Sequence, residues 1–229
     1  MSDPRDDLDR VDAATQELLT AVGRLDAPAL TEPCQLPGWT RGHLLAHVSR
    51  NADALDRVLR GEPMYASAEA RDADIEAGAG RGPAEQLDDL RASADRLSAT
   101  ARALGDPDWE REVELRGGVR DLAARIPFRR LAEVEIHHVD LDVGRGFRDL
   151  PAAFVERQVD VMARRFLGNP DVPGLELRAD SGNHWRSGVE RGEPLVVTGD
   201  PVDLLAWLMG RSTGSGLTAD GELPALPKF

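Results

Sequence analysis

The sequence predicts an α+β protein, with an N-terminal four-helix bundle followed by a small C-terminal α+β domain. Four long segments before Gly144 carry apolar residues at the spacing of an amphipathic helix. After Gly144 the composition changes, and short alternating segments stand between two helical ones. A chain of 229 residues is long enough to bury a substantial core. We therefore expect two domains, at residues 1–147 and 148–229.

The predicted bundle helices have recognisable start signals. Pro4 lies in the first turn of the first helix, where a missing N–H costs nothing. Thr40 precedes the second helix and is a residue type that caps helix N-termini. The third helix carries apolar residues alternately three and four positions apart, as at the seam of a bundle. The helices are expected at residues 4–26, 40–60, 83–104 and 127–141, with a short helix at 68–76 and an extended segment at 109–115.

The C-terminal part has a different pattern. Alternating or continuous short apolar runs predict strands, and longer amphipathic runs predict helices. A helix is expected at residues 151–167, strands at 175–179 and 195–197, and a helix from Asp200 to Gly210. His184 is expected in a loop. The order helix–strand–strand–helix indicates a small α+β unit.

The acidic composition excludes some classes of function. The formal net charge is −13, so a broad nucleic-acid-binding surface, which needs clustered basic residues, is not expected. A small anionic substrate stays compatible, because one or two arginines in a pocket suffice. No apolar run is long enough to span a bilayer, and the acidic N-terminus lacks a signal-peptide core. We expect a soluble cytoplasmic protein that binds neither nucleic acid nor membrane.

The fourth predicted helix carries a candidate metal site. Glu133, His137 and Asp140 are spaced i, i+4 and i+7, so they lie on one side of that helix. A carboxylate and an imidazole one turn apart can both reach a single divalent ion, and His47 of the second helix is a candidate third ligand. Two histidines and one carboxylate form a three-ligand zinc site with an open position, which is the catalytic pattern.

Each of these residues has a structural alternative. Glu133 and His137 could be a surface pair on one helix face, and His47 could be a buried core histidine. His43, one turn before His47, could compete as a ligand, whereas His138 points about 100° away from His137. Asp140 could orient a ligand imidazole or simply end the helix.

Cys34 is the only cysteine, which excludes an internal disulfide and a cysteine-based zinc knuckle. A single free cysteine is more often buried and inert than a nucleophile. If the chemistry needs a thiol, we therefore expect it to come from outside the chain. The sequence also lacks a P-loop and the motifs G-x-G-x-x-G, G-x-S-x-G and H-E-x-x-H.

Several stretches resemble a known family. Residues 37–47 and 130–140 resemble the DinB-like mycothiol-dependent enzymes, and residues 63–77 resemble the maleylpyruvate isomerase branch of these enzymes. Residues 198–211 resemble the second, sterol-carrier-like domain of that branch. The resemblance covers most of the chain, and it implies a DinB-like metal-binding bundle followed by the small α+β domain.

The resemblance also implies a function. His47, Glu133 and His137 would bind zinc or another divalent ion, and Arg211 and Arg71 would hold the carboxylates of a dicarboxylate substrate. Mycothiol would be the thiol cofactor for isomerisation of maleylpyruvate to fumarylpyruvate in gentisate degradation, by thiolate addition, bond rotation and elimination. We expect a monomer.

The residues alone leave other interpretations open. Arg211 at a helix end could complement the helix dipole, and Arg71 could form a solvated ion pair. Another mycothiol-dependent transferase or detoxification enzyme would share the metal and the thiol. A non-enzymatic module that binds metal or thiol is the remaining alternative, because fold alone does not fix function.

Overall fold

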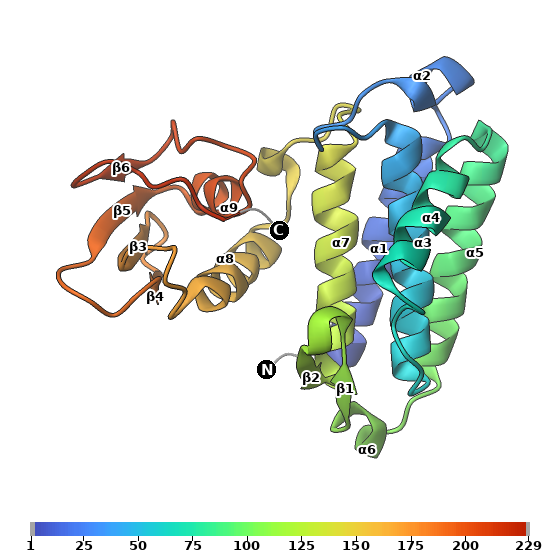
Figure 1. The fold of residues 1–229 in the computed structure, drawn as a ribbon, viewed down its shortest axis with the longest axis horizontal. Helices are drawn as coiled ribbons and strands as arrows, with labels where there is room; N and C mark the ends of the chain where they lie inside the picture. Colours follow the sequence, from blue (N-terminus) through green and yellow to red (C-terminus); the bar gives the residue numbers. More distant parts are fainter. Residues whose placement is uncertain (1–2, 228–229) are drawn as a thin grey trace. The chain divides into compact units, whose positions relative to one another are not determined.

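The computed structural model describes residues 3–227 and confirms the α+β fold (Figure 1). The chain forms two compact units, one ending at Arg145 and the other beginning at Gly146. The first unit is a helical bundle with a small hairpin, and the second contains a four-stranded sheet. No described helix is both long and apolar enough to span a membrane.

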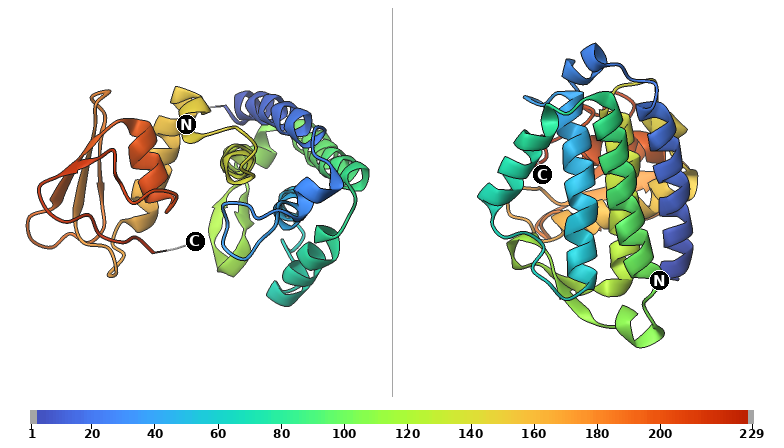
Figure 2. Two further views of the ribbon diagram at one scale, coloured as in Figure 1. Left: turned by 90° about the horizontal axis from the view of Figure 1, so that it is seen from above. Right: turned by 90° about the vertical axis from the view of Figure 1, so that its right-hand side faces the viewer.

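Four long helices form the bundle, as predicted. Helix α1 packs against α7 and α5, and α3 packs against α5, α4 and α7. Figure 2 shows the long helices side by side in its right-hand view. Their bounds are α1 Pro4–Val22, α3 Arg41–Leu59, α5 Pro83–Arg102 and α7 Ile126–Asp140.

The predicted start signals act as expected. The Asp3 carboxylate accepts a hydrogen bond from the Arg5 N–H, and Pro4 occupies the first turn of α1. Thr40 caps α3 through a reciprocal pair: its hydroxyl oxygen accepts from the His43 N–H, and His43 Nδ1 accepts from the Thr40 N–H. This cap fixes where α3 begins and therefore which of its residues face α7.

Shorter elements complete the first unit. The hairpin β1–β2 pairs antiparallel, with Val113 opposite Asp121. Of the predicted extended segment, only the middle is a strand, because Trp109 ends a helical turn instead. The bounds are α2 Ala27–Thr31, α4 Ala68–Ala79, α6 Asp106–Trp109, β1 Glu112–Glu114, η1 Arg116–Gly118, β2 Arg120–Leu122 and η2 Ala123–Arg125.

The hairpin covers one end of the bundle. An apolar cluster there includes Leu55 and Leu59 of α3, Ile126 of α7 and Val113 of the hairpin, all buried. Burial of each such side chain stabilises the fold by about 1.5–3 kcal/mol. This cluster holds α3 and α7 together at the end opposite to the N-terminus of α3.

The second unit has more strands than the sequence predicted. Its sheet has the order β4-β3-β5-β6, with β3 and β5 parallel and both outer pairs antiparallel. Helices α8 and α9 pack on each other and on the sheet (Figure 2, left). The bounds are η3 Phe147–Asp149, α8 Ala152–Phe166, β3 Leu175–Ala179, β4 His184–Ser187, β5 Leu195–Gly199, α9 Pro201–Leu208 and β6 Thr218–Ala219.

The prediction of a loop at His184 is wrong, because His184 begins strand β4. A tight turn joins β3 to β4: the Ala179 N–H donates to the Asn183 carbonyl oxygen at 2.8 Å, and Gly182 has φ 95°. Strand β4 is an edge strand with polar residues on its exposed side, so it lacks a clear apolar alternation. The glycine-containing turn was the available signal.

Candidate metal centre

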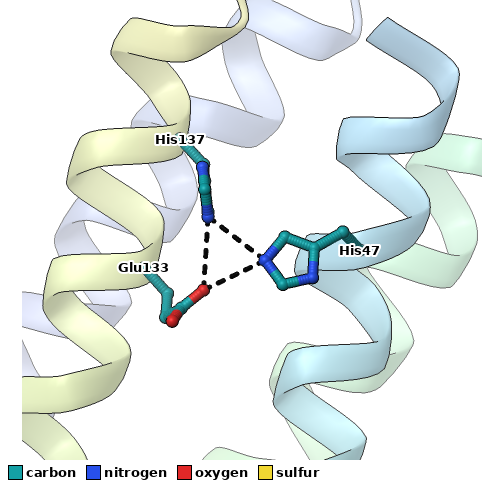
Figure 3. A group of neighbouring side chains, drawn as sticks. All are labelled: His47, Glu133 and His137. Atoms are coloured by element: carbon teal, nitrogen blue, oxygen red, sulfur yellow. Dashed lines mark hydrogen bonds and ion pairs between the residues drawn. The ribbon is translucent and has the colours of Figure 1, made fainter. Parts of the chain in front are cut away.

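Helices α3 and α7 bring three predicted ligands to one point. His47 Nε2 lies 3.2 Å from Glu133 Oε2 and 3.1 Å from His137 Nε2. His137 Nε2 lies 3.3 Å from Glu133 Oε2. Figure 3 shows the three side chains pointing toward one another from the two helices. Among the described residues, no other group of three His, Cys, Asp or Glu side chains converges in this way.

The spacing of these atoms fits a metal ion. Zinc–nitrogen and zinc–oxygen bonds of about 2.0–2.2 Å in a tetrahedron place neighbouring ligand atoms about 3.3–3.5 Å apart. The three observed separations of 3.1–3.3 Å are close to this value. Glu133 Oε2 is buried and faces the Nε2 atoms of both histidines. A buried carboxylate oxygen beside two imidazole nitrogens is suited to share a cation with them.

The charges in the cluster depend on one another. Burial by itself would raise the pKa of the Glu133 carboxyl group, but hydrogen bonds and charge interactions with His137 and His47 hold that pKa well below its ordinary value. Glu133 is therefore ionised at neutral pH. Its side chain as a whole is 33% exposed, although the Oε2 atom that faces the two histidines is buried.

His137 is oriented by a carboxylate. Burial disfavours its charged form, but hydrogen bonds to Asp140 and Glu133 outweigh burial and raise the pKa of His137 to about 9. Asp140 Oδ2 lies 2.9 Å from His137 Nδ1, and Asp140 is fully buried. This contact directs Nε2 toward the cluster, as outer carboxylates do for metal-binding histidines. A divalent ion would displace the His137 proton from Nε2.

His47 has different neighbours. Burial is the main cause that lowers the pKa of His47, against the opposing effect of Glu133. The Trp39 ring lies 5.5 Å from the His47 ring, measured between centroids. Arg71 Nη2 lies 3.3 Å from His47 Nδ1. His47 is thus bordered by an aromatic ring and a guanidinium group.

The two predicted arginines lie in different units. Arg71 is on α4 beside the cluster, and its side chain is mostly buried and paired with Asp72 at 2.6 Å. Arg211 follows α9 in the second unit, where its Nη1 donates to the Met209 carbonyl oxygen at 2.7 Å.

The other histidines of the two helices have other partners. His43 contributes to the cap of α3, and its Nε2 lies 3.2 Å from the exposed carboxylate of Glu76. His138 is buried outside the cluster, where burial and the nearby Arg145 charge lower its pKa to about 4.

Two residues beside the cluster were not predicted as part of the site. Trp39 directly precedes the capping residue Thr40 and lies beside His47. An aromatic residue immediately before the helix that carries a candidate ligand was the available signal. Arg130 lies three residues before Glu133 on the same face of α7. Helical spacing was the signal for Arg130, but its complete burial could not be read from the sequence.

The fold and the converging side chains together indicate the class of protein to which the chain belongs. Four long helices that direct two imidazoles and a carboxylate toward one point, followed by a small α+β unit, are the features of a DinB-like two-domain protein. The sequence matches the mycothiol maleylpyruvate isomerase N-terminal domain over residues 11–142 and the MDMPI C-terminal domain over residues 149–228. The chain belongs to the mycothiol maleylpyruvate isomerase family and is an isomerase.

Solved structures agree with this assignment. The crystal structure of the mycothiol-dependent maleylpyruvate isomerase is 27% identical in sequence, with full coverage of both chains and a TM-score of 0.90. A crystal structure of a mutant of that isomerase, with alanine in place of one histidine, gives the same identity, coverage and TM-score. A comparison with curated protein sequences gave no match.

Proposed function

We propose that this protein isomerises maleylpyruvate to fumarylpyruvate, with mycothiol as thiol cofactor and a divalent ion, zinc, bound by His47, Glu133 and His137. One observation supports this most directly. Three ligand atoms converge at tetrahedral spacing in a chain whose two domains both match the isomerase family. Two imidazoles and one carboxylate leave a position open, as catalytic zinc sites do.

When bound, the ion supplies the charge that lowers a thiol pKa, and the thiol supplies the reversible addition that lets the C=C bond rotate before elimination. The residues of the chain orient these groups. Asp140 holds the His137 ring so that its Nε2 faces the point where the ion would be bound. Cys34 is half-buried, and burial raises the pKa of its thiol, which fits a thiol from outside.

We assign the substrate carboxylates to arginines. Arg71 reaches the edge of the cluster beside His47, and a guanidinium group binds a carboxylate through two parallel hydrogen bonds. Arg211 would hold the second carboxylate. Both positive charges would also stabilise the negative charge that develops on the substrate oxygen during the reaction.

The proposal is tested by following maleylpyruvate turnover in the ultraviolet, with and without mycothiol, on protein of measured metal content. We expect turnover to need both metal and mycothiol, and the product to be fumarylpyruvate free of thiol. A thiol conjugate as product would support a mycothiol-dependent transferase instead. Undiminished turnover without any thiol would exclude the addition step.

The arginine assignment has a separate test. We expect Arg211→Ala to lower turnover while the protein keeps its metal, because Arg211 is assigned to the substrate and not to the ion. Arg178→Ala is the matched control, since Arg178 lies in the same unit and forms an exposed pair with Glu176. Equal turnover in both variants would remove Arg211 from the site.

A further inference from the structure

Arg130 is the largest fully buried side chain among the described residues. It is 1% exposed, and its Nη1 donates to the Val48 carbonyl oxygen at 2.8 Å and to Asn51 Oδ1 at 2.9 Å. Both acceptors are neutral and both lie on α3. The guanidinium group therefore crosses from α7 to α3 inside the bundle.

Among the described residues, the positive charge of Arg130 has no ion-pair partner. Its Nε and Nη2 atoms are buried without a hydrogen-bond partner, and within residues 3–227 no carboxylate accepts a hydrogen bond from it. Arg145 shows the usual solution, because its mostly buried guanidinium group pairs with Glu135 at 2.5 Å. A buried charge without such a pair costs several kcal/mol. Its retention in the core needs a reason.

Arg130 stays charged at neutral pH. Burial lowers its pKa to about 10, against the opposing effects of Glu133, Asp53 and Tyr65, in that order. Glu133 has the largest of these opposing effects. A residue of the candidate metal centre thus acts on the Arg130 charge more than Asp53 or Tyr65 does.

The position of Arg130 explains this coupling. Arg130 and Glu133 are three residues apart on α7, a spacing that makes them neighbours on one helix face. Its acceptor Val48 directly follows His47 on α3. A full positive charge thus lies beside the cluster, between the two helices that carry its ligands.

We propose that Arg130 is a positioning residue that acts by charge: it weakens the hold of the cluster on a divalent cation and strengthens the binding of an anion at the open position. This inference rests on the proposed function, in which that anion is a thiolate. A like charge at short range in the bundle interior repels the cation, and an opposite charge is attracted. The Arg130 charge would thus lower the affinity of the cluster for its cation and raise its affinity for an anionic ligand.

The test uses Co²⁺ and thiocyanate as probes on the full-length protein. Co²⁺ affinity is measured by competition with a chromophoric chelator, and thiocyanate affinity by visible absorption of the Co²⁺-loaded protein. We expect Arg130→Met to bind Co²⁺ about tenfold more tightly and thiocyanate about tenfold more weakly, because one like charge near the ion is removed. Lost hydrogen bonds alone would instead loosen the Co²⁺ site.

Two controls separate charge from packing. Arg130→Lys keeps the positive charge and should give values close to those of the wild type. Arg129→Met removes the neighbouring arginine of α7, which pairs with Asp121 of strand β2, and should change neither affinity. Arg130→Lys also keeps the test decisive if Arg130→Met fails to fold. Tighter Co²⁺ binding and weaker thiocyanate binding in Arg130→Lys, which keeps the charge, would contradict the charge role.

The outcomes distinguish this inference from the proposed function. Weaker Co²⁺ binding or unchanged thiocyanate binding in Arg130→Met would overturn the inference and leave the proposed function standing. Absence of Co²⁺ binding by the wild-type protein would overturn both.

Discussion

Helices α3 and α7 meet in two regions of opposite character. Toward the hairpin end, Leu55 and Leu59 of α3 and Ile126 of α7 belong to one apolar cluster, each at most 2% exposed. Toward the other end, His47 of α3 faces Glu133 and His137 of α7. The same two helices therefore form an apolar contact at one end and a contact between ionisable side chains at the other.

The difference separates stability from chemistry. The apolar region gains free energy by removing surface from water. The polar region removes ionisable groups from water, which disfavours folding unless those groups are paired. The fold keeps a costly cluster where it is useful, and the adjacent apolar region compensates for it. Changes in the two regions should therefore affect different measurements.

The largest effect is expected from His47→Ala, which removes one of three ligands. Activity and metal content should both fall by more than about 100-fold, while the protein stays folded. Loss of an outer-shell partner already costs about 10–100-fold, and His47 is assigned as a direct ligand. Metal analysis, turnover and circular dichroism check this. Full activity in a metal-free His47→Ala protein would contradict the proposed metal role.

Leu55→Ala should give the converse result in the apolar region. Truncating a buried leucine costs about 2–5 kcal/mol of unfolding free energy, measured by urea denaturation. The metal affinity of the folded fraction should be unchanged, since Leu55 belongs to the apolar cluster and not to the metal cluster. A tenfold loss of metal affinity would show that the two regions are not separable.

Asp140→Asn should produce an intermediate effect within the polar region. The asparagine amide oxygen is a weaker acceptor than a carboxylate for the hydrogen bond from His137 Nδ1–H, so the His137 ring is less firmly oriented. Metal affinity should fall by about 10–100-fold, as measured by chelator competition. Asp142→Asn, two residues further along the chain, is the control, because no described contact joins its side chain to the cluster.

The smallest effect is expected from His43→Ala, one turn before His47 on α3. His43 belongs to the cap, so its loss should cost about 0.5–2 kcal/mol of stability, measured by thermal or urea unfolding. Metal content and turnover should stay at wild-type values. Loss of metal in this variant would make His43 a ligand and weaken the distinction between the two histidines.

Much of the site was predictable because helices are periodic. Glu133 and His137 lie one turn apart whenever residues 126–140 are helical, and Thr40 sets the start of the helix that carries His47. Strand β4 was missed because its pairing with β3 makes it a strand, whereas its own sequence lacks a strand-like apolar pattern. Arg130 entered the sequence analysis only as the first residue of the stretch 130–140 that resembles the family.

The sequence by itself determined the long helices and the residue types able to bind a cation. It did so because capping, apolar spacing and composition act locally along the chain. Only the tertiary structure decided that residues 47 and 133, far apart in sequence, lie 3.2 Å apart and that Arg130 is buried without a carboxylate. Both facts depend on how α3 packs against α7, and packing is a property of two surfaces together.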